Sequence, residues 1–185
     1  VMNRPRLRRG DLETVRAALA LCGSPQRCFP VIHVTGSNGK GSVAYRTARA
    51  LHAASLRVGL FVSPHLFHPR ERISVSLIPL SPPALDAAIS SVQTRCAAVY
   101  PALAFFDVLL VAALCHFASA RVDVAVLEGG IGARRDAVPT AGQQSFEALK
   151  KLGARLGFLG HSHVPVGFFD TDPITYTLDP EIPLD

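Results

Sequence analysis

Residues 36–42 combine glycines, a lysine and a serine in a pattern that can bind phosphate. This segment reads GSNGKGS and follows the β-branched run 31–34. Glycines let backbone N–H groups converge on an anion, and the start of a following helix adds the positive end of its dipole. Lys40 would supply a mobile cation for β- and γ-phosphates, and Ser42 a hydroxyl for phosphate or metal. We therefore predict a phosphate-binding loop; the alternative is a glycine-rich turn with an unrelated lysine.

The segment departs from the commonest phosphate-loop pattern, G-x-x-x-x-G-K-[ST]. That pattern requires glycine at position 34 and serine or threonine at position 41, where this chain has Val34 and Gly41. The strand expected before the loop and the helix expected after it still favour phosphate binding.

Two more polar groups follow apolar runs. Ser63-Pro64 comes after the run 58–62, and Glu128 comes after the run 122–127. In open parallel sheets, ligands bind beyond the carboxyl ends of the strands. We therefore expect Ser63 and Glu128 to lie at the same edge of a sheet as the phosphate loop.

The elements that would position these residues alternate between strand and helix patterns. This alternation predicts an α/β fold, an incomplete doubly wound and mostly parallel sheet that carries the phosphate loop. Strands are expected at 31–34, 58–62, 72–75 and 122–127, and helices at 11–21, 43–54, 84–100 and 103–120.

Composition argues against several other functions. The net charge is +5, but 16 of the 19 cations are arginines scattered along the chain, so we expect no nucleic-acid partner. The apolar segment 103–120 is about as long as a membrane span, yet it contains Asp107 and His116 and fits a buried helix better. The four cysteines form no C-x-x-C pair, and no signal peptide is visible. Free thiols and a cytoplasmic location are therefore expected.

Three ordered motifs resemble those of one enzyme family. Residues 35–42, TGSNGKGS, resemble the loop of folylpolyglutamate and dihydrofolate synthases in the Mur ligase superfamily. Residues 63–66 with 71–73 resemble the S-P-H-L and E-R-I segment of that family, and residues 127–137 resemble its L-E-x-G-[IL]-G-G-R-x-D-A block. Phe105-Phe106-Asp107 stands where the family usually has F-F-E. The resemblance covers about residues 10–139.

This resemblance implies an ATP-dependent ligase of folate metabolism that uses Mg²⁺. Its substrates would be ATP, L-glutamate and either dihydropteroate or folate, joined through an acyl phosphate. Lys40 would stabilise the transferring phosphoryl group, Glu128 and Ser63 would hold Mg²⁺, and His65 and Arg72 would contact substrate. The nucleotide phosphates would lie on the loop residues Thr35, Gly36, Ser37, Asn38, Gly39, Lys40, Gly41 and Ser42.

The last part of the chain reads differently. Residues 160–165, GHSHVP, resemble the last metal motif of calcineurin-like metallophosphoesterases, in which His161 and His163 would bind a metal. We therefore expect two units, a partial ATP-binding domain at 1–140 and a phosphoesterase-like tail at 141–185. Such a chain would be a truncated or chimeric ligase with little activity. A metal-dependent phosphoesterase fragment and a non-catalytic ATP-binding module remain the alternatives, and the oligomeric state is open.

Overall fold

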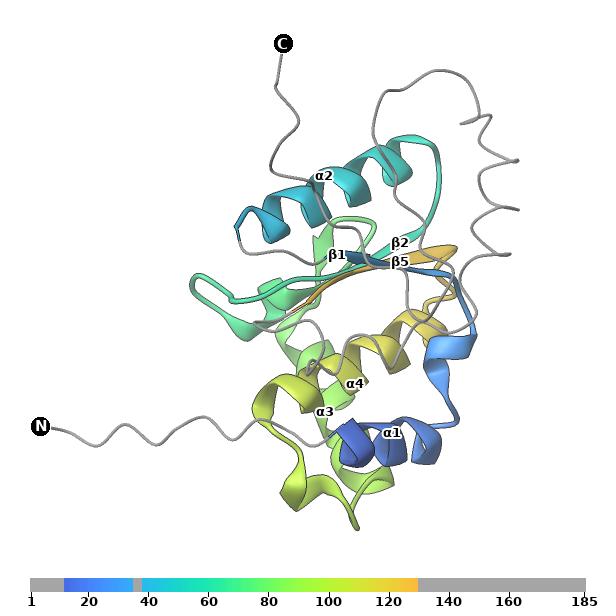
Figure 1. Ribbon diagram of the computed structural model, residues 1–185, viewed down its shortest axis with the longest axis vertical. Coiled ribbons are helices and arrows are strands. Elements are labelled where there is room, and N and C mark those ends of the chain that lie inside the picture. The colour runs from blue at the N-terminus through green and yellow to red at the C-terminus, as the bar shows by residue number, and fades with distance from the viewer. Residues whose placement is uncertain (1–11, 35–37, 130–185) are drawn as a thin grey trace, which may run out of the picture.

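The protein is described by a computed structural model that covers residues 12–34 and 38–129. Figure 1 shows the three layers of this part of the chain. Helix α2 lies on one face of a central sheet, α4 lies on the other face, and α1 and α3 pack beyond α4. The predicted α/β architecture with helices on both faces of the sheet is therefore confirmed.

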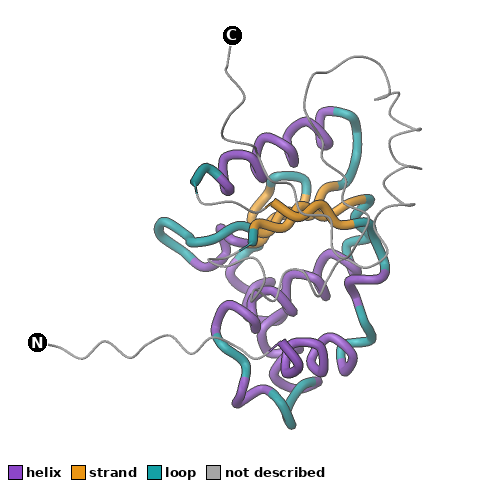
Figure 2. Tube along the Cα trace, in the orientation of Figure 1, coloured by secondary structure: helices purple, strands orange, loops and turns teal. Residues whose placement is uncertain are grey.

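The sheet has five strands in the order β1-β5-β2-β3-β4. Strands β1, β5 and β2 are parallel, β3 is antiparallel to β2, and β4 is antiparallel to β3. The strands are the orange segments in Figure 2. The predicted strands 31–34, 58–62, 72–75 and 122–127 all form, within one or two residues of their expected bounds. The strands are β1 (Val31–Val34), β2 (Val58–Phe61), β3 (Ile73–Val75), β4 (Ile78–Pro79) and β5 (Val124–Glu128).

The parallel register brings three chain segments to one edge of the sheet. Val34, the last residue of β1, lies opposite Glu128, and Phe61, the last residue of β2, lies opposite Leu127. The phosphate loop, the Ser63 segment and Glu128 therefore leave the sheet side by side. The register thus confirms the shared edge that the sequence predicted.

The helices follow the predicted pattern with one correction. They are α1 (Leu12–Leu21), α2 (Lys40–Ala53), α3 (Pro82–Arg95) and α4 (Phe105–Ser119), and the short 3-10 helices are η1 (Pro25–Arg27), η2 (Pro69–Arg72) and η3 (Tyr100–Ala102). The prediction that α3 continues to Tyr100 was wrong. Helix α3 ends at Arg95, because its C-terminal cap residue Cys96 has φ −106° and ψ 20°, outside the α-helical region, and η3 begins at Tyr100.

Helix α4 forms from the apolar segment 103–120, in which the charged Asp107 argues against a membrane span. Asp107 is buried, and its Oδ2 accepts a hydrogen bond of 3.1 Å from the backbone N–H of Ala104, at the start of the helix. The carboxylate thus satisfies a helix-terminal N–H group that would otherwise have no intrahelical partner. No helix in the described part of the chain combines the length and the apolar character needed to cross a membrane.

Two apolar clusters fill the space on either side of the sheet. The larger cluster joins the sheet to α4 and continues to α1 and α3, whereas the smaller cluster lies between the sheet and α2. Gly59 allows the closest approach in the larger cluster, because a Cβ atom at this position would lie 2.8 Å from the ring of Phe117. The ring therefore packs directly on the backbone of β2.

Candidate functional site

The described part of the phosphate loop leads directly into α2. Gly39 is the N-terminal cap residue of this helix, with φ 73°, and Lys40 is the first helical residue. The carbonyl of Gly39 accepts the N–H of Val43 at 3.0 Å, so the first helical turn is formed. The first N–H groups of an α-helix generally lack an acceptor inside the helix and can donate to an anion. Residues 35–37 of the predicted loop lie outside the described residues.

Glu128 is the last residue of β5 and reaches the start of α2. Its side chain is buried, and its Oε2 accepts a hydrogen bond of 2.8 Å from the backbone N–H of Ser63. A Cβ atom at Gly41 would lie 3.4 Å from Oε2 and 3.6 Å from Oε1. These are ordinary van der Waals distances, so Gly41 and the Glu128 carboxylate lie next to each other.

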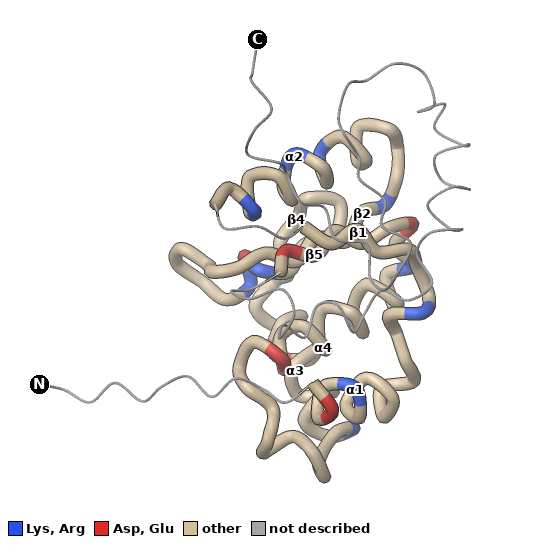
Figure 3. Tube along the Cα trace, viewed as in Figure 1, with Lys and Arg blue, Asp and Glu red and all other residues tan. Residues whose placement is uncertain are grey.

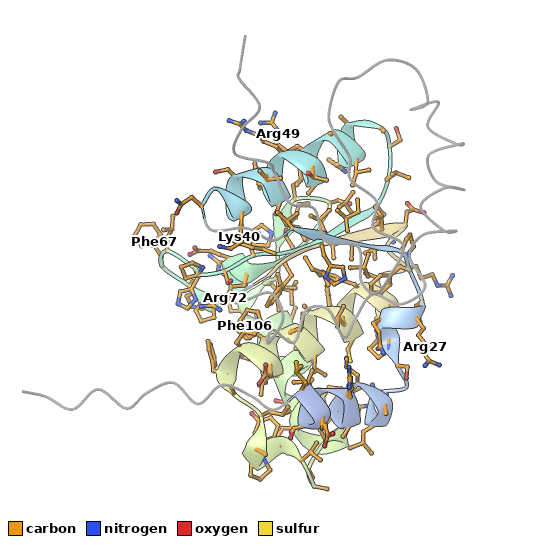
Figure 4. The ribbon with its side chains drawn as sticks, in the orientation of Figure 1. Arg27, Lys40, Arg49, Phe67, Arg72 and Phe106 are labelled. Carbon is orange, nitrogen blue, oxygen red and sulfur yellow. The ribbon has the colours of Figure 1, made fainter. Side chains whose placement is uncertain are left out.

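Burial and the positive charges of Lys40 and Arg72 affect the pKa of Glu128. Burial raises the pKa of its carboxyl group, while the Ser63 N–H and the positive charges of Lys40 and Arg72 act in the opposite direction and favour the carboxylate. In Figure 4, Lys40 and Arg72 lie at the same end of the molecule, Lys40 at the start of α2 and Arg72 below it. Figure 3 shows acidic and basic residues together at this end of the sheet. The site therefore holds a buried acid between two cations.

Arg72 is fixed by two neighbours. Its Nε donates a hydrogen bond of 2.9 Å to Nδ1 of His65, and its guanidinium carbon lies 5.7 Å from the centre of the Phe105 ring. Because Nδ1 accepts, the neutral imidazole of His65 carries its proton on Nε2. Burial lowers the pKa of Arg72, and the charge of Glu128 opposes that shift. An arginine nevertheless stays protonated in proteins, so it remains a cation at the site.

The segment between Ser63 and Arg72 is organised by Glu71. Its carboxylate accepts backbone N–H groups of Leu66 at 2.8 Å, Phe67 at 3.1 Å and His68 at 2.6 Å. These hydrogen bonds, that of Leu66 first, lower the pKa of Glu71. The side chains of Leu66 and Phe67 point outward and are 84% and 92% exposed.

No protein-family model matches. The chain is 40% identical over 138 residues to the dihydrofolate synthase/folylpolyglutamate synthase of Mycobacterium tuberculosis, and 38% identical over 138 residues to the folylpolyglutamate synthase of Lacticaseibacillus casei. The M. tuberculosis folylpolyglutamate synthase structure complexed with ADP matches with a TM-score of 0.66 at 42% identity over 70% of this chain. The Thermotoga maritima enzyme matches with a TM-score of 0.68 at 33% identity over 71% of this chain.

Over about 70% of its length, the chain is homologous to the folylpolyglutamate synthase/dihydrofolate synthase family. The family resemblance expected from the three sequence motifs is thereby confirmed. The chain covers 28% of the M. tuberculosis relative and 32% of the L. casei relative. It therefore corresponds to about a third of a synthase of this family.

The structure brings together most of the site residues that the sequence predicted. Lys40, Gly41, Ser63 and Glu128 meet at the carboxyl edge of the sheet, and Arg72 with His65 adjoins them. Asn38, Gly39 and Ser42 are described and exposed at the start of α2. The predicted sites at Thr35, Gly36, Ser37, His161 and His163 lie outside the described residues.

Sequence reasoning assigned no role to two residues beside this site. Glu71 stands in the E-R-I motif, which could have suggested a role for its carboxylate, but its three backbone partners become visible only in the folded loop. Phe105 was noted as part of F-F-D, and no feature of the sequence indicated that it would lie against Arg72.

Proposed function

We propose that residues 35–42 bind the phosphates of ATP and that Lys40 stabilises the γ-phosphoryl group during its transfer. The observation that carries this proposal is the convergence of the α2 N-terminus, Lys40 and Glu128 at one edge of the sheet. For phosphoryl transfer, a protein mainly positions groups and neutralises charge. The similarity to the M. tuberculosis structure complexed with ADP supports nucleotide binding by this chain.

The residues present fit Mg²⁺. This hard cation prefers oxygen ligands and is usually held by one or two carboxylates together with phosphate oxygens and water. Glu128 uses Oε2 to accept the Ser63 N–H, and the side chain of Ser63 carries a hydroxyl that could also bind the ion. Among the described residues, no three His, Cys, Asp or Glu side chains form a group that could hold a metal ion. Glu128 and Ser63 would therefore hold Mg²⁺ together with the nucleotide, and the ion would neutralise phosphate charge.

The reaction that we propose is ATP-dependent amide formation on a folate. A substrate carboxylate would take the γ-phosphoryl group, and the amine of L-glutamate would then displace phosphate from the acyl phosphate. Arg72, oriented by His65 and Phe105, would bind the substrate's negative charge next to the transferred group. Dihydropteroate and folate both remain candidate substrates, as the names of the relatives suggest.

The extent of activity is a separate proposal, because the chain spans about a third of these relatives. We propose that it binds nucleotide and has little ligase activity, as a partial ATP-binding domain at 1–140 followed by a second unit at 141–185. We also propose a cytoplasmic location, which the four free cysteines support.

Nucleotide titration of paired variants tests the binding proposal. Calorimetry with Mg-ADP is compared for the unmodified chain, Lys40→Ala and Arg49→Ala. Both substitutions remove one cation from α2, but Arg49 lies toward the other end of the helix (Figure 4). Losing a charge-assisted contact of about 2 kcal/mol predicts a roughly 30-fold weaker Kd for Lys40→Ala and no change for Arg49→Ala. Equal loss in both variants, or no binding by the unmodified chain, would contradict the proposal.

Ligation is measured separately with radiolabelled glutamate, ATP and either dihydropteroate or a reduced folate. We expect little incorporation above background even where Mg-ADP binds. Incorporation at the rate of a full-length synthase would show that the described site is catalytically sufficient and would overturn the proposal of low activity.

A further inference from the structure

Three cysteines that are distant in sequence meet on the α4 side of the sheet. Cys22 follows the last residue of α1, Cys96 is the C-terminal cap of α3, and Cys115 lies on α4. The sulfurs of Cys22 and Cys96 are 3.5 Å apart and separated by 74 positions in the chain. Cys28 is exposed. The first three thiols therefore form a group to which the proposed ligase chemistry gives no role.

The geometry favours one pair within this group. The 3.5 Å separation is van der Waals contact, and a disulfide of about 2.0 Å would require the two sulfurs to approach by about 1.5 Å. Both residues lie at helix ends, where their backbone N–H groups still bond to Ala18 and Val92 in the preceding turns. After Cys22 the chain leaves the helix through Gly23, with φ 80°. A small adjustment at these two ends involves no helix interior.

We propose that Cys22 and Cys96 are a dithiol that forms an intramolecular disulfide when the chain meets a peroxide. Cys22 is 6% exposed and Cys96 is fully buried, so the peroxide reaches Cys22 first. The Cys22 thiolate attacks a peroxide oxygen, breaks the O–O bond and becomes a sulfenic acid. The Cys96 thiolate then attacks the Cys22 sulfur and expels hydroxide. Two thiols and one hydrogen peroxide thus yield one disulfide and two waters.

Burial makes this reaction slow rather than impossible. It raises the pKa of Cys96 to about 11 and that of Cys115 to about 12, so little thiolate is available near neutral pH. The nearby cation Arg95 acts in the opposite direction on both thiols, while the neighbouring thiols add to the effect of burial. Cys115 also interacts with Cys22 and is the internal competitor.

The disulfide would join α1 to α3 on the face of the sheet opposite α2. It would restrain the helical layer and leave the start of α2, with Lys40, untouched (Figure 1). Oxidation and nucleotide binding are therefore independent, and a failure of one proposal leaves the other standing.

The test uses the full chain in two matched variants, each with two of the four cysteines. Cys28→Ala/Cys115→Ala keeps the proposed pair, and Cys28→Ala/Cys96→Ala keeps Cys22 with its competitor Cys115. Both are treated with hydrogen peroxide, folded and in urea, and analysed by thiol titration, intact mass and peptide mapping. We expect the first variant to lose both thiols and two hydrogens as a monomer when folded, more slowly than in urea because both thiols are buried, but with the intramolecular disulfide as its main product. The folded second variant should give a several-fold smaller share of intramolecular disulfide.

The unmodified chain provides a measurement that does not depend on the variants folding. Its non-reduced peptide map should contain a Cys22–Cys96 peptide as the main oxidised product. A main product of Cys22–Cys115, of Cys22 sulfinic acid without a disulfide, or of dimers through Cys28 would overturn the proposal. Mg-ADP affinity, measured before and after oxidation, should differ by less than twofold.

Discussion

The two faces of the sheet are packed in different ways. On the α4 face, large side chains such as Phe61, Phe117 and Leu114 are completely buried, and further helices pack on α4 from outside. On the α2 face, the helix contributes the small residues Ala44 and Ala48 to a much smaller cluster. The first face therefore contains most of the apolar burial, whereas the second brings a helix close to the sheet.

This difference separates stability from function. Alanines let α2 lie near the strands, so that its first turn begins beside the carboxyl ends of β1 and β5. Glu128 is the last residue of a strand that is buried throughout, and its side chain points toward that helix, as its distance from Gly41 shows. We infer that the α4 face stabilises the domain and that the α2 face holds the geometry of the phosphate site. Four predictions test this separation.

Phe117→Ala should have the largest effect and should act on stability alone. Removing a fully buried phenylalanine ring that packs on Gly59 leaves a cavity and costs about 4 kcal/mol of unfolding free energy. Urea unfolding measures this loss, and Mg-ADP titration at low temperature should give an unchanged Kd for the folded fraction. A weaker Kd for Mg-ADP with unchanged unfolding free energy would contradict the assignment of stability to the α4 face.

Acid should destabilise the α4 face through His33. This residue of β1 alternates with Ile32 and Val34, which pack toward α2, so it points to the other face. Its ring nitrogens have no hydrogen-bond partner among the described residues, and burial lowers its pKa from 6.5 to about 4.

The folded state therefore binds fewer protons than the unfolded state between these pKa values, and stability falls as the pH falls through this window. The loss attributable to His33 should reach at most about 3 kcal/mol. Unfolding free energies measured across the window should show a flatter profile for His33→Leu than for the unmodified chain. The exposed His68 offers the control, and His68→Gln should leave the slope unchanged. Equal slopes in all three proteins would contradict the assignment.

Ala48→Leu should affect both stability and Mg-ADP binding, because it overpacks the α2 face. Ala48 is fully buried between α2 and the sheet, and added methyl groups there cost about 2 kcal/mol. Since the helix must move outward, we also expect Mg-ADP binding to weaken. Ala50→Leu, at an exposed position of the same helix, is the matched control and should change neither quantity. Destabilisation without any change in Kd would show that the phosphate site tolerates movement of α2.

Glu128→Gln should change stability least of the four, and unlike Phe117→Ala and Ala48→Leu it should increase stability slightly. Burial raises the pKa of Glu128, so the folded state binds more protons and stability falls as the pH rises from the ordinary value of 4.5 through the raised value. Glutamine keeps an acceptor for the Ser63 N–H and has no charge to bury. The variant should therefore be slightly more stable at neutral pH, while Mg²⁺ should no longer strengthen nucleotide binding. A loss of stability would mean that Lys40 and Arg72 outweigh burial.

Much of the fold was predictable from periodicity. Strands β1, β2 and β5 and helices α1 and α4 stand within two residues of their expected bounds, because β-branched runs and helical apolar spacing are local signals, and α2 begins three residues earlier than expected. The sequence predicted strand β3 of the β3–β4 hairpin but not strand β4. Its turn places Ser76 and Leu77 at φ 50° and 66°, a conformation usually signalled by glycine or asparagine. Without those residues, the sequence contained no turn signal.

The sequence by itself determined the elements, the phosphate-loop motif and the family, since each depends on residue types at short and fixed spacing. Only the tertiary structure decided that Glu128 lies beside Gly41, that Glu71 organises the segment before Arg72, and that Cys22 meets Cys96. These contacts join residues whose positions depend on strand register, loop path and the packing of helices. No local pattern encodes such distances, because they arise when the whole sheet and its two helical layers assemble.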